Sequence, residues 1–307
     1  MFTQRILIIL TIVLMILPAC TREEAQKVDL SKTETISNDK RGQAGAIRIA
    51  VGGMITPKEG FAYYRELLDY IGSELGQPVQ YVDATSYEEI NNKLESREIE
   101  AAFICSGPYV SGHKKFGLEL LAAPQAYGKT VYYSYIIVPS ESSARSLEDL
   151  RGKSFAFSDP LSNTGKLVPE YLLTRKGENS KTFFSKTVFS YSHDKSIIAV
   201  ADGMVDGAAV DSLIWEYLNK IKPELTGKTR ILLKSDPYAI PPFVVHPSLD
   251  PALKEKLRTL LLRAHTKPEG KKILDKMMTE KFVPISDSAY DSIREINRWI
   301  ARQKGEK

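Results

Sequence analysis

The residues best suited to binding an anion form one short segment, Ser162-Asn163-Thr164-Gly165, which follows the strand-like run 154–157. Ser, Asn and Thr often cap the first turn of a helix, and glycine lets the backbone lie close to a ligand. The start of a helix also presents unpaired N–H groups at the positive end of the helix dipole. Together these groups could hold a tetrahedral oxyanion, although an ordinary capped helix would use the same residues.

Three further polar side chains stand at positions where α/β proteins commonly bind ligands. His193 opens a helix-like segment, Asp211 ends the apolar run 207–210, and Tyr109 follows the apolar run 101–105. Open α/β sheets bind ligands at the carboxyl ends of such strands. Each residue has a structural alternative, because His193 could be a surface or capping residue, Asp211 could cap the next helix, and Tyr109 could belong to the core.

The same residues raise the question of catalysis. Ser162, His193 and Asp211 are the residue types of a hydrolytic triad, in that order along the chain. No serine lies in a G-x-S-x-G elbow, and Ser162 stands in a capping sequence, so the residue types alone are weak evidence for an enzyme. The four histidines and Cys105 show no metal-ligand spacing. The sequence therefore predicts neither an enzyme nor a metal or other cofactor.

Alternating strand and helix patterns position these residues and predict an α/β fold with mostly parallel sheets. Residues 47–51 form a strand-like run, and apolar residues recur at three- and four-residue spacing over 61–75, as in a helix. Ser86, with Glu89 three residues later, has the pattern of a capping box at the start of the next helix. The apolar run 101–105 predicts a short buried strand.

This pattern repeats weakly at a constant distance of 106 residues. Three pairs of segments correspond at this distance: 49–51 with 155–157, Ser86 with Ser192, and 100–102 with 206–208. In the first and third pairs both segments are strand-like, and in the second pair both serines open a helix. We therefore predict two lobes of the same design, with chance resemblance between two ordinary βα units as the alternative.

The rest of the chain can be divided between these two lobes. We expect lobe 1 to comprise 46–135 and 238–307, and lobe 2 to comprise 136–237. The chain would cross between the lobes near 133–139 and again at the proline-rich 232–242. Two similar lobes joined by a two-strand hinge leave a cleft between them, which is a natural ligand site.

The N-terminal residues have the character of an export signal. Ile6–Leu17 is almost wholly apolar, and its twelve residues are too few for a membrane-spanning helix, which needs about 20. The run ends in Leu17-Pro18-Ala19-Cys20, which resembles the lipobox of bacterial lipoproteins. We expect a signal peptide over 1–19, lipidation of Cys20 and a flexible tether over 20–45. A short anchor helix with an incidental cysteine is the alternative.

The composition is consistent with an exported globular protein. The chain has 307 residues, with 42 Lys and Arg against 38 Asp and Glu, and two Cys. This length suits one or two domains, and a net charge of +4 is too small to indicate nucleic-acid binding. A disulfide-rich miniprotein, a collagen and a wholly disordered chain are excluded. With Cys20 lipidated, Cys105 would lack a disulfide partner and is expected to be a buried apolar residue.

Taken together, these segments resemble the substrate-binding proteins of phosphate, phosphite and phosphonate ABC importers. The resemblance runs from Ile47 to about Val283. Five passages carry it: Tyr64–Tyr70, Ala102-Phe103 with Gly107-Pro108-Tyr109, Ser158-Asp159-Pro160 through Ser162-Asn163-Thr164-Gly165 to Pro169, Ser192-His193-Asp194, and Val205–Asp211. It implies a two-lobed periplasmic-binding-protein type II fold, a phosphorus oxyanion as ligand, an ABC permease as partner, and a periplasmic or cell-surface location.

The resemblance also implies a role for each candidate residue. Ser162, Asn163 and Thr164 would hold the phosphonyl oxygens through hydroxyl and backbone N–H groups. His193 would donate a hydrogen bond to another oxygen. Asp211 would accept a hydrogen bond from a protonated oxygen or from an amino group of the ligand.

Tyr109 would close the site from lobe 1. An ionised Asp211 facing the anion would reject sulfate, which has no proton to share, and accept protonated phosphate-type anions or an aminophosphonate zwitterion. One departure from the family concerns the loop 52–57, where Met54 and Ile55 replace the polar or aromatic contacts common in related proteins.

Two other binding functions remain open on the residues alone. A protein of the same fold that binds another organic acid would be expected to hold the carboxylate with an arginine fork. Lys166 is the basic residue nearest to 162–164, and no Arg lies between Lys176 and Lys228, which favours neutral donors. A periplasmic sensor lipoprotein is the second alternative, because docking to a permease leaves no recognisable motif.

Overall fold

The computed structural model describes residues 45–52, 57–303 and 305. The described residues all belong to one compact unit. Within the described ranges, no helix combines the length and apolar character needed to cross a membrane. The predicted signal peptide, Cys20, most of the predicted tether, and Met54 with Ile55 lie outside the described residues.

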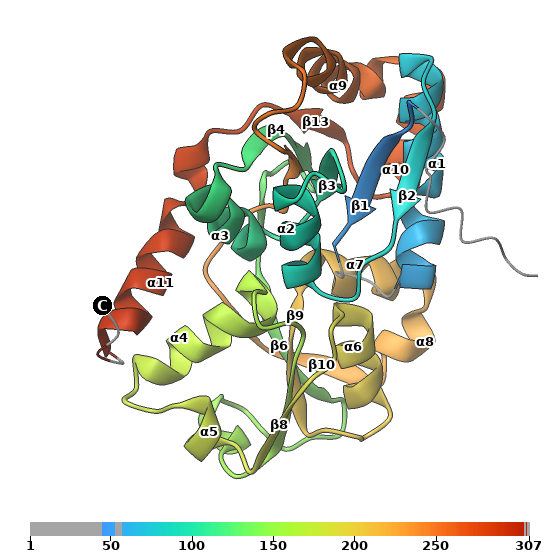
Figure 1. Ribbon diagram of the computed structural model, residues 1–307. Coiled ribbons are helices and arrows are strands. Elements are labelled where there is room, and N and C mark those ends of the chain that lie inside the picture. The colour runs from blue at the N-terminus through green and yellow to red at the C-terminus, as the bar shows by residue number, and fades with distance from the viewer. Residues whose placement is uncertain (1–44, 53–56, 304, 306–307) are drawn as a thin grey trace, which may run out of the picture. The chain divides into compact units, whose positions relative to one another are not determined.

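A six-stranded sheet contains the first strands of the described chain, in the order β13-β4-β12-β3-β1-β2 (Figure 1). Its strands are β1 (Ile47–Val51), β2 (Val79–Val82), β3 (Ala101–Phe103), β4 (Glu119–Gln125), β12 (Phe243–Val245) and β13 (Lys281–Val283). Helices α1 (Pro57–Leu75), α2 (Tyr87–Glu95) and α3 (Ser106–Phe116) connect β1 to β4 in turn. Ser86 caps α2 by accepting a hydrogen bond from the Glu89 N–H, as the capping-box pattern predicts.

A five-stranded sheet has the order β10-β6-β9-β7-β8. Its strands are β6 (Ser134–Pro139), β7 (Ser154–Phe157), β8 (Lys186–Phe189), β9 (Gly207–Asp211) and β10 (Thr229–Lys234). The helical segments between them are η2 (Glu148–Leu150), η3 (Asn163–Leu167), α4 (Val168–Thr174), α5 (Ser180–Phe183), α6 (His193–Ala201), α7 (Ser212–Ile221) and α8 (Pro223–Thr226).

The α/β class is confirmed, and each sheet is mixed, with antiparallel strands beside a majority that share one direction. β1 is parallel to β2 and β3, and β7 is parallel to β8 and β9. β12 runs antiparallel to β3 and β4, and β6 runs antiparallel to β9 and β10. Helical crossovers produce the parallel pairs. The chain reaches β6 and β12 through extended segments without a helix. These two strands therefore run in the direction opposite to that of their neighbours.

The predicted internal repeat is visible in the strand order. The run β2-β1-β3-β12-β4 in the first sheet corresponds to β8-β7-β9-β6-β10 in the second, with the same directions. Helices α2 and α6 each contain 9 residues and begin at Tyr87 and His193, which are 106 positions apart. Tyr87 is therefore the counterpart of His193.

Two extended segments carry the chain between the sheets. The first passes through β5 (Val131–Tyr132) into β6, and the second passes through β11 (Tyr238–Ala239) towards β12. β5 and β11 pair antiparallel, with Tyr238 opposite Tyr132. The predicted lobe boundaries, 135/136 and 237/238, fall beside this pair and stay a prediction.

The C-terminal helices are α9 (Pro251–Arg263), η4 (Ala264–Thr266), α10 (Pro268–Lys276), η5 (Asp287–Tyr290) and α11 (Asp291–Gln303). α9 contacts α1 and the strands β4 and β13 of the six-stranded sheet. α11 contacts both α3 and α4 (Figure 1). The last helix thus touches elements attached to each of the two sheets.

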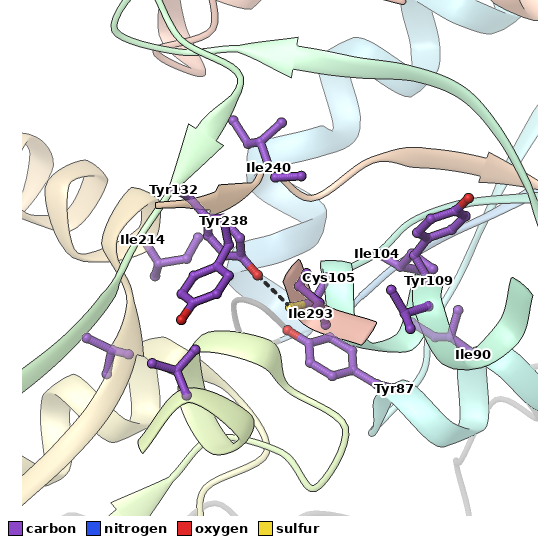
Figure 2. Packing of buried hydrophobic residues seen from close by; sticks show 14 of the residues in the cluster. Tyr87, Ile90, Ile104, Cys105, Tyr109, Tyr132, Ile214, Tyr238, Ile240 and Ile293 are labelled. Carbon is purple, nitrogen blue, oxygen red and sulfur yellow. Dashed lines mark hydrogen bonds between the residues drawn. The ribbon is translucent and has the colours of Figure 1, made fainter. Parts of the chain in front are cut away.

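One buried cluster contains residues from both sheets and from the β5–β11 pair. Figure 2 shows Cys105 and Tyr132 together in it, with the thiol and the hydroxyl 3.4 Å apart. Cys105 is fully buried, as predicted, and forms no disulfide with any residue that the structure describes. Because the loops after β3, β7 and β9 start from this packed region, their polar side chains are held in defined positions.

Candidate functional site

Ser162, Asn163 and Thr164 lie at the start of a helical segment, as predicted, and all three are fully buried. The first turn, η3, is a wide π-helical turn, and α4 continues from it. Ser162 is the N-cap residue, because its Oγ accepts a hydrogen bond from the Gly165 N–H at 2.9 Å. Asn163 Oδ1 and Thr164 Oγ1 have no hydrogen-bond partner within the described chain.

Gly165 packs against Ser158 and His193. A methyl group placed on Gly165 would lie 1.7 Å from Oγ of Ser158 and 3.0 Å from Cε1 of His193. His193 in turn is hydrogen-bonded to Asp211, because the Asp211 backbone N–H donates to Nδ1 of the imidazole at 3.0 Å. The structure therefore brings the 162–164 segment, His193 and Asp211 into one site, and glycine is required at position 165 because a side chain would collide with its neighbours.

His193 is a neutral hydrogen-bond donor. Its Nδ1 accepts the Asp211 N–H, so the neutral ring carries its proton on Nε2. Burial of the whole ring lowers the pKa of His193 to about 3, because a charged imidazolium would be poorly solvated there. Nε2 is buried and has no partner among the described residues. The site thus contains an N–H donor without a positive charge.

Asp211 both caps a helix and presents a second oxygen. Its Oδ1 accepts a hydrogen bond from the Leu213 N–H at 2.7 Å at the start of α7, while Oδ2 has no partner in the described part of the chain. Burial raises the pKa of Asp211 to about 7. The capping role and the ligand-binding role are therefore compatible, because each uses a different oxygen.

Residues that follow strands of the six-stranded sheet pack against the segment 158–165. The Tyr87 N–H donates to Oδ2 of Asp159 at 3.1 Å. Gly107, in the first turn of α3, packs so closely that an added methyl would lie 2.1 Å from the Leu161 carbonyl oxygen. The Tyr87 hydroxyl is buried without a partner that the structure describes. Burial raises the pKa of Tyr87 well above its usual value, so this hydroxyl is also a neutral group.

Seven buried polar atoms in these contacting segments have no hydrogen-bond partner among the described residues. They are Ser158 Oγ, Asn163 Oδ1, Thr164 Oγ1, Ser192 Oγ, His193 Nε2, Asp211 Oδ2 and the Tyr87 hydroxyl. Buried polar atoms are nearly always hydrogen-bonded, so such a group identifies a candidate site for a polar ligand. Five of the seven can donate a hydrogen bond, and two are acceptors.

Basic side chains are not part of this group. The buried polar residues that the structure describes include neither Lys nor Arg. Lys166, the nearest basic residue in sequence, forms an ion pair with Glu170 and lies 4.2 Å from the centre of the Phe157 ring. Within the described ranges, no three His, Cys, Asp or Glu side chains are grouped as a metal site requires.

Comparison with known proteins identifies the class to which this site belongs. Residues 50–290 match the family of periplasmic substrate-binding proteins of phosphonate ABC transporters. The chain belongs to this family. It is accordingly an extracytoplasmic substrate-binding component of an ABC transporter and not an enzyme.

Two relatives cover most of the chain. The probable ABC transporter phosphite binding protein PhnD1 of Prochlorococcus marinus is 30% identical over 239 residues, which are 74% of this chain and 80% of the relative. The phosphate-import protein PhnD of Mycolicibacterium smegmatis is 27% identical over 262 residues, 76% of this chain and 79% of the relative.

Solved structures of similar proteins have the same two-lobed fold. A binding protein component of an ABC phosphonate transporter from Pseudomonas aeruginosa superposes with a TM-score of 0.81 at 24% identity, over 85% of this chain and 88% of that one. PhnD1 from Prochlorococcus marinus in complex with methylphosphonate gives a TM-score of 0.77 at 20% identity, over 84% and 99% of the two chains. The predicted fold is confirmed by these likenesses.

Tyr109 does not join the site of this binding protein in the way the sequence suggested. Its hydroxyl donates to Oδ1 of Asp287 at 2.5 Å, and its ring packs edge-on against Tyr290 with centroids 4.7 Å apart. Figure 2 shows this hydroxyl directed away from Cys105, whereas the Tyr87 hydroxyl is directed towards Cys105. The expectation that Tyr109 closes the site is corrected, because α11 and η5 cover α3 on the side where Tyr109 points.

Tyr87 and Ser158 are the residues that sequence reasoning missed. Tyr87 could have been found from the internal repeat, since it stands 106 positions before His193 and occupies the same place at a helix start. Ser158 lies in the quoted passage before Ser162, but only the tertiary contact with Gly165 distinguishes it from its neighbours.

Cys105 occupies the position in the first half that Asp211 occupies in the second. Each is the N-cap residue of the helix after a central strand, and the two are 106 positions apart. The Tyr132 hydroxyl contacts the Cys105 thiol and also accepts a hydrogen bond from Nδ2 of Asn163 at 3.1 Å. Burial raises the pKa of the thiol, so Cys105 is a packed, unreactive group that helps to position Asn163 through Tyr132.

Proposed function

We propose that this protein is the lipid-anchored substrate-binding protein of an ABC importer and that it binds a phosphorus oxyanion (phosphonate, phosphite or phosphate) between the two sheets. The observation that carries this proposal is the group of seven buried polar atoms without partners, contributed by both halves of the repeat. An anion held there would satisfy hydrogen-bonding capacity that is otherwise lost on burial.

The donors suit an oxyanion in a site without cations. The hydroxyls of Ser158, Thr164, Ser192 and Tyr87 and the Nε2–H of His193 can each donate to an oxygen. Dipoles fixed in place by folding stabilise an anion without the need to desolvate a buried cation. This composition disfavours the alternative of an organic acid held by an arginine fork.

Asp211 explains why the ligand would be a phosphorus oxyanion and not sulfate. Its Oδ2 needs a hydrogen bond, and one proton shared between this oxygen and the ligand provides it. Phosphate and phosphonate monoanions carry a P–OH proton near neutral pH, whereas sulfate has none. Sulfate supplies no proton. It would either face an ionised carboxylate in a buried site, which is strongly unfavourable, or bind only while Asp211 keeps its own proton, which is lost as the pH passes through about 7.

The relatives support the same ligand class. One is named as a phosphite binding protein, a second as a phosphate-import protein, and a solved neighbour contains methylphosphonate. The sequence Leu17-Pro18-Ala19-Cys20 supports attachment through a lipid on Cys20. Labelling with a radioactive fatty acid would detect the lipid, and Cys20→Ser should abolish both the labelling and membrane association.

The ligand class is tested by titration calorimetry on the full-length protein, purified in detergent. Phosphate, phosphite, methylphosphonate and sulfate are titrated separately. We expect at least one phosphorus ligand to bind, and sulfate to bind at least 100-fold more weakly. Thr164→Val should weaken binding about tenfold, since a neutral hydrogen bond contributes about 1 kcal/mol and the buried partner oxygen is left unpaired. The exposed Thr259→Val is the matched control. Tighter binding of sulfate, or no binding of any phosphorus ligand, would contradict the proposal.

A further inference from the structure

The polar site is enclosed by the protein. The seven polar atoms without described partners are buried, and the residues that carry them are at most 1% exposed. A ligand the size of phosphate can therefore reach or leave these atoms only if the two sheets, with their helices, move apart about the β5–β11 pair. The contacts that hold the two sheets together then contribute to the time for which a ligand stays bound.

One such contact joins Asp159 to the start of α2. Asp159 lies in the loop after β7, and its Oδ2 accepts the backbone N–H of Tyr87 at 3.1 Å. The two residues are 72 positions apart, and they follow strands of different sheets. Asp159 is 2% exposed, so this hydrogen bond forms away from solvent. It has to break when the sheets separate.

The start of α2 is well suited to receive a carboxylate. Ser86 is the N-cap residue, and its Oγ accepts the Glu89 N–H, which leaves the Tyr87 N–H for another acceptor. The first N–H groups of a helix have no partners within the helix and lie at the positive end of its dipole. An ionised carboxylate that reaches this point from the other sheet makes a charge-assisted hydrogen bond with the helix.

The second oxygen of Asp159 fixes the same carboxylate beside the segment 162–165. Oδ1 accepts the Leu161 N–H at 2.8 Å, and the Asp159 carbonyl oxygen accepts the Ser162 N–H at 3.0 Å. Asp159 is thus held in a defined position just before the N-cap residue of η3. Gly107 of α3 packs against the Leu161 carbonyl oxygen, so the same loop also contacts a second helix of the other sheet.

We propose, on the basis of the function proposed above, that Asp159 is a positioning residue that holds the two sheets closed around the ligand. Both of its carboxylate oxygens are used within the protein, so it acts without touching the ligand. Its bond to the start of α2 keeps the Tyr87 hydroxyl on the side of His193. Because this bond is the same for every ligand, its contribution to affinity is the same for every ligand. It slows release and leaves association unchanged, since a ligand enters the open form, in which the bond is absent.

Binding kinetics of the full-length protein in detergent test this inference. Association and dissociation rates of phosphate, phosphite and methylphosphonate are measured by stopped-flow tryptophan fluorescence for the natural protein and for two variants at position 159. Asp159→Ala should speed dissociation about 10- to 100-fold for every ligand that binds, because a buried hydrogen bond to a charged group is lost. Association should stay within about twofold. Asp159→Asn keeps the shape of the side chain and should have a smaller effect in the same direction; it replaces the alanine variant if that one does not fold.

The distance between the two sheets gives a readout that a purely local role in the loop would not change. Spin labels on Lys114→Cys in α3 and Lys195→Cys in α6 report this distance by double electron–electron resonance. Both positions are exposed. With Cys20 lipidated and Cys105 buried, labelling is confined to them. At saturating phosphate or methylphosphonate, Asp159→Ala should show a larger share of long distances than the natural protein.

Asp250→Asn is the matched control. Asp250 also caps a helix, because its Oδ1 accepts the Leu253 N–H at 2.9 Å, but both residues belong to the same end of α9. This variant loses a carboxylate from a helix start without affecting a contact between the sheets. It should change neither the dissociation rates nor the distances.

The outcomes separate this inference from the proposed function. If phosphorus ligands bind and both Asp159 variants release them at the natural rate with the natural distances, the inference is overturned while the proposed function stands. Faster release of one ligand alone would make Asp159 a ligand contact and would also overturn it. If no phosphorus ligand binds the natural protein, both fail.

Discussion

The backbone N–H of Asp211 donates to Nδ1 of His193 at 3.0 Å, and this hydrogen bond joins the end of β9 to the start of α6. It determines that the imidazole proton lies on Nε2. Asp211 uses one carboxylate oxygen to cap α7 and leaves the other without a partner. A buried neutral donor and a buried acceptor are thus held next to each other by a single backbone interaction.

Removal of the His193 donor is expected to weaken ligand binding. His193→Ala should reduce affinity for the best phosphorus ligand about 10- to 100-fold, because a buried donor to an anion contributes about 1.5–3 kcal/mol. Because burial lowers the pKa of His193 to about 3, this residue should cause no change in affinity between pH 5 and pH 8. Calorimetry across that range measures both effects. His113→Ala, on the surface of α3, is the control, and an equal loss there would contradict the assignment.

Asp211 should make the unliganded protein less stable as the pH rises. Burial raises its pKa from 3.8 to about 7, so between these values the folded state binds a proton that the unfolded state has lost. This stabilisation is complete below pH 3.8 and disappears as the pH passes through about 7. The change in the free energy of unfolding amounts to a few kcal/mol at most.

The measurement for Asp211 is urea denaturation from pH 4 to pH 8 without ligand. Asp211→Asn removes the titrating group, so its free energy of unfolding should depend less on pH than that of the natural protein. Asp159, whose pKa is also raised by burial, remains in both proteins and contributes with the same sign. Identical pH profiles would show that Asp211 is ionised in the folded protein throughout this range.

A side chain at position 165 is expected to disrupt the site. Gly165→Ala would place its methyl 1.7 Å from the Ser158 hydroxyl oxygen and 2.8 Å from the Ser158 Cβ. Overpacking of this kind destabilises proteins by about 1–3 kcal/mol and should also abolish ligand binding. Thermal denaturation and calorimetry measure the two effects. The double variant Gly165→Ala with Ser158→Ala removes the oxygen and should recover part of the stability; no recovery would place the clash elsewhere.

Tyr87 of α2 and Tyr109 of α3 should respond differently to loss of their hydroxyls. Tyr87→Phe should weaken ligand binding about tenfold, because the Tyr87 hydroxyl has no other described partner. Tyr109→Phe should leave affinity within about twofold and reduce stability by about 1 kcal/mol, because its hydroxyl bonds Asp287. Calorimetry and denaturation on both variants make the comparison. The reverse pattern would restore Tyr109 as the residue that closes the site.

Much of the local structure follows from the sequence alone. The apolar run 47–51 forms β1 with those bounds, and Ser86 caps α2 as the capping-box pattern predicts. The residue types at 162–165, 193 and 211 also indicate segments that the fold brings together, since caps, strand ends and helix starts depend on neighbouring residues.

The repeat of 106 residues predicts the parallel half of each sheet, because strand–helix–strand units of similar length fold alike. The repeat does not predict that β6 and β12 run antiparallel to their neighbours, because the direction of these strands depends on where the chain crosses between the sheets.

Only the tertiary structure decided which side chains share the site. The sequence singles out Tyr109, which follows an apolar run, and not Tyr87, although both lie near the start of a helix. Packing of η5 and α11 against α3 takes the Tyr109 hydroxyl to Asp287 and leaves Tyr87 on the side of His193 and Asp211.

The sequence by itself thus determined the class of the protein and predicted the segments proposed to form the site. The tautomer of His193 and the separate roles of the two Asp211 carboxylate oxygens required the fold. Each arises from contacts between segments far apart in the chain, and local sequence patterns do not encode such contacts.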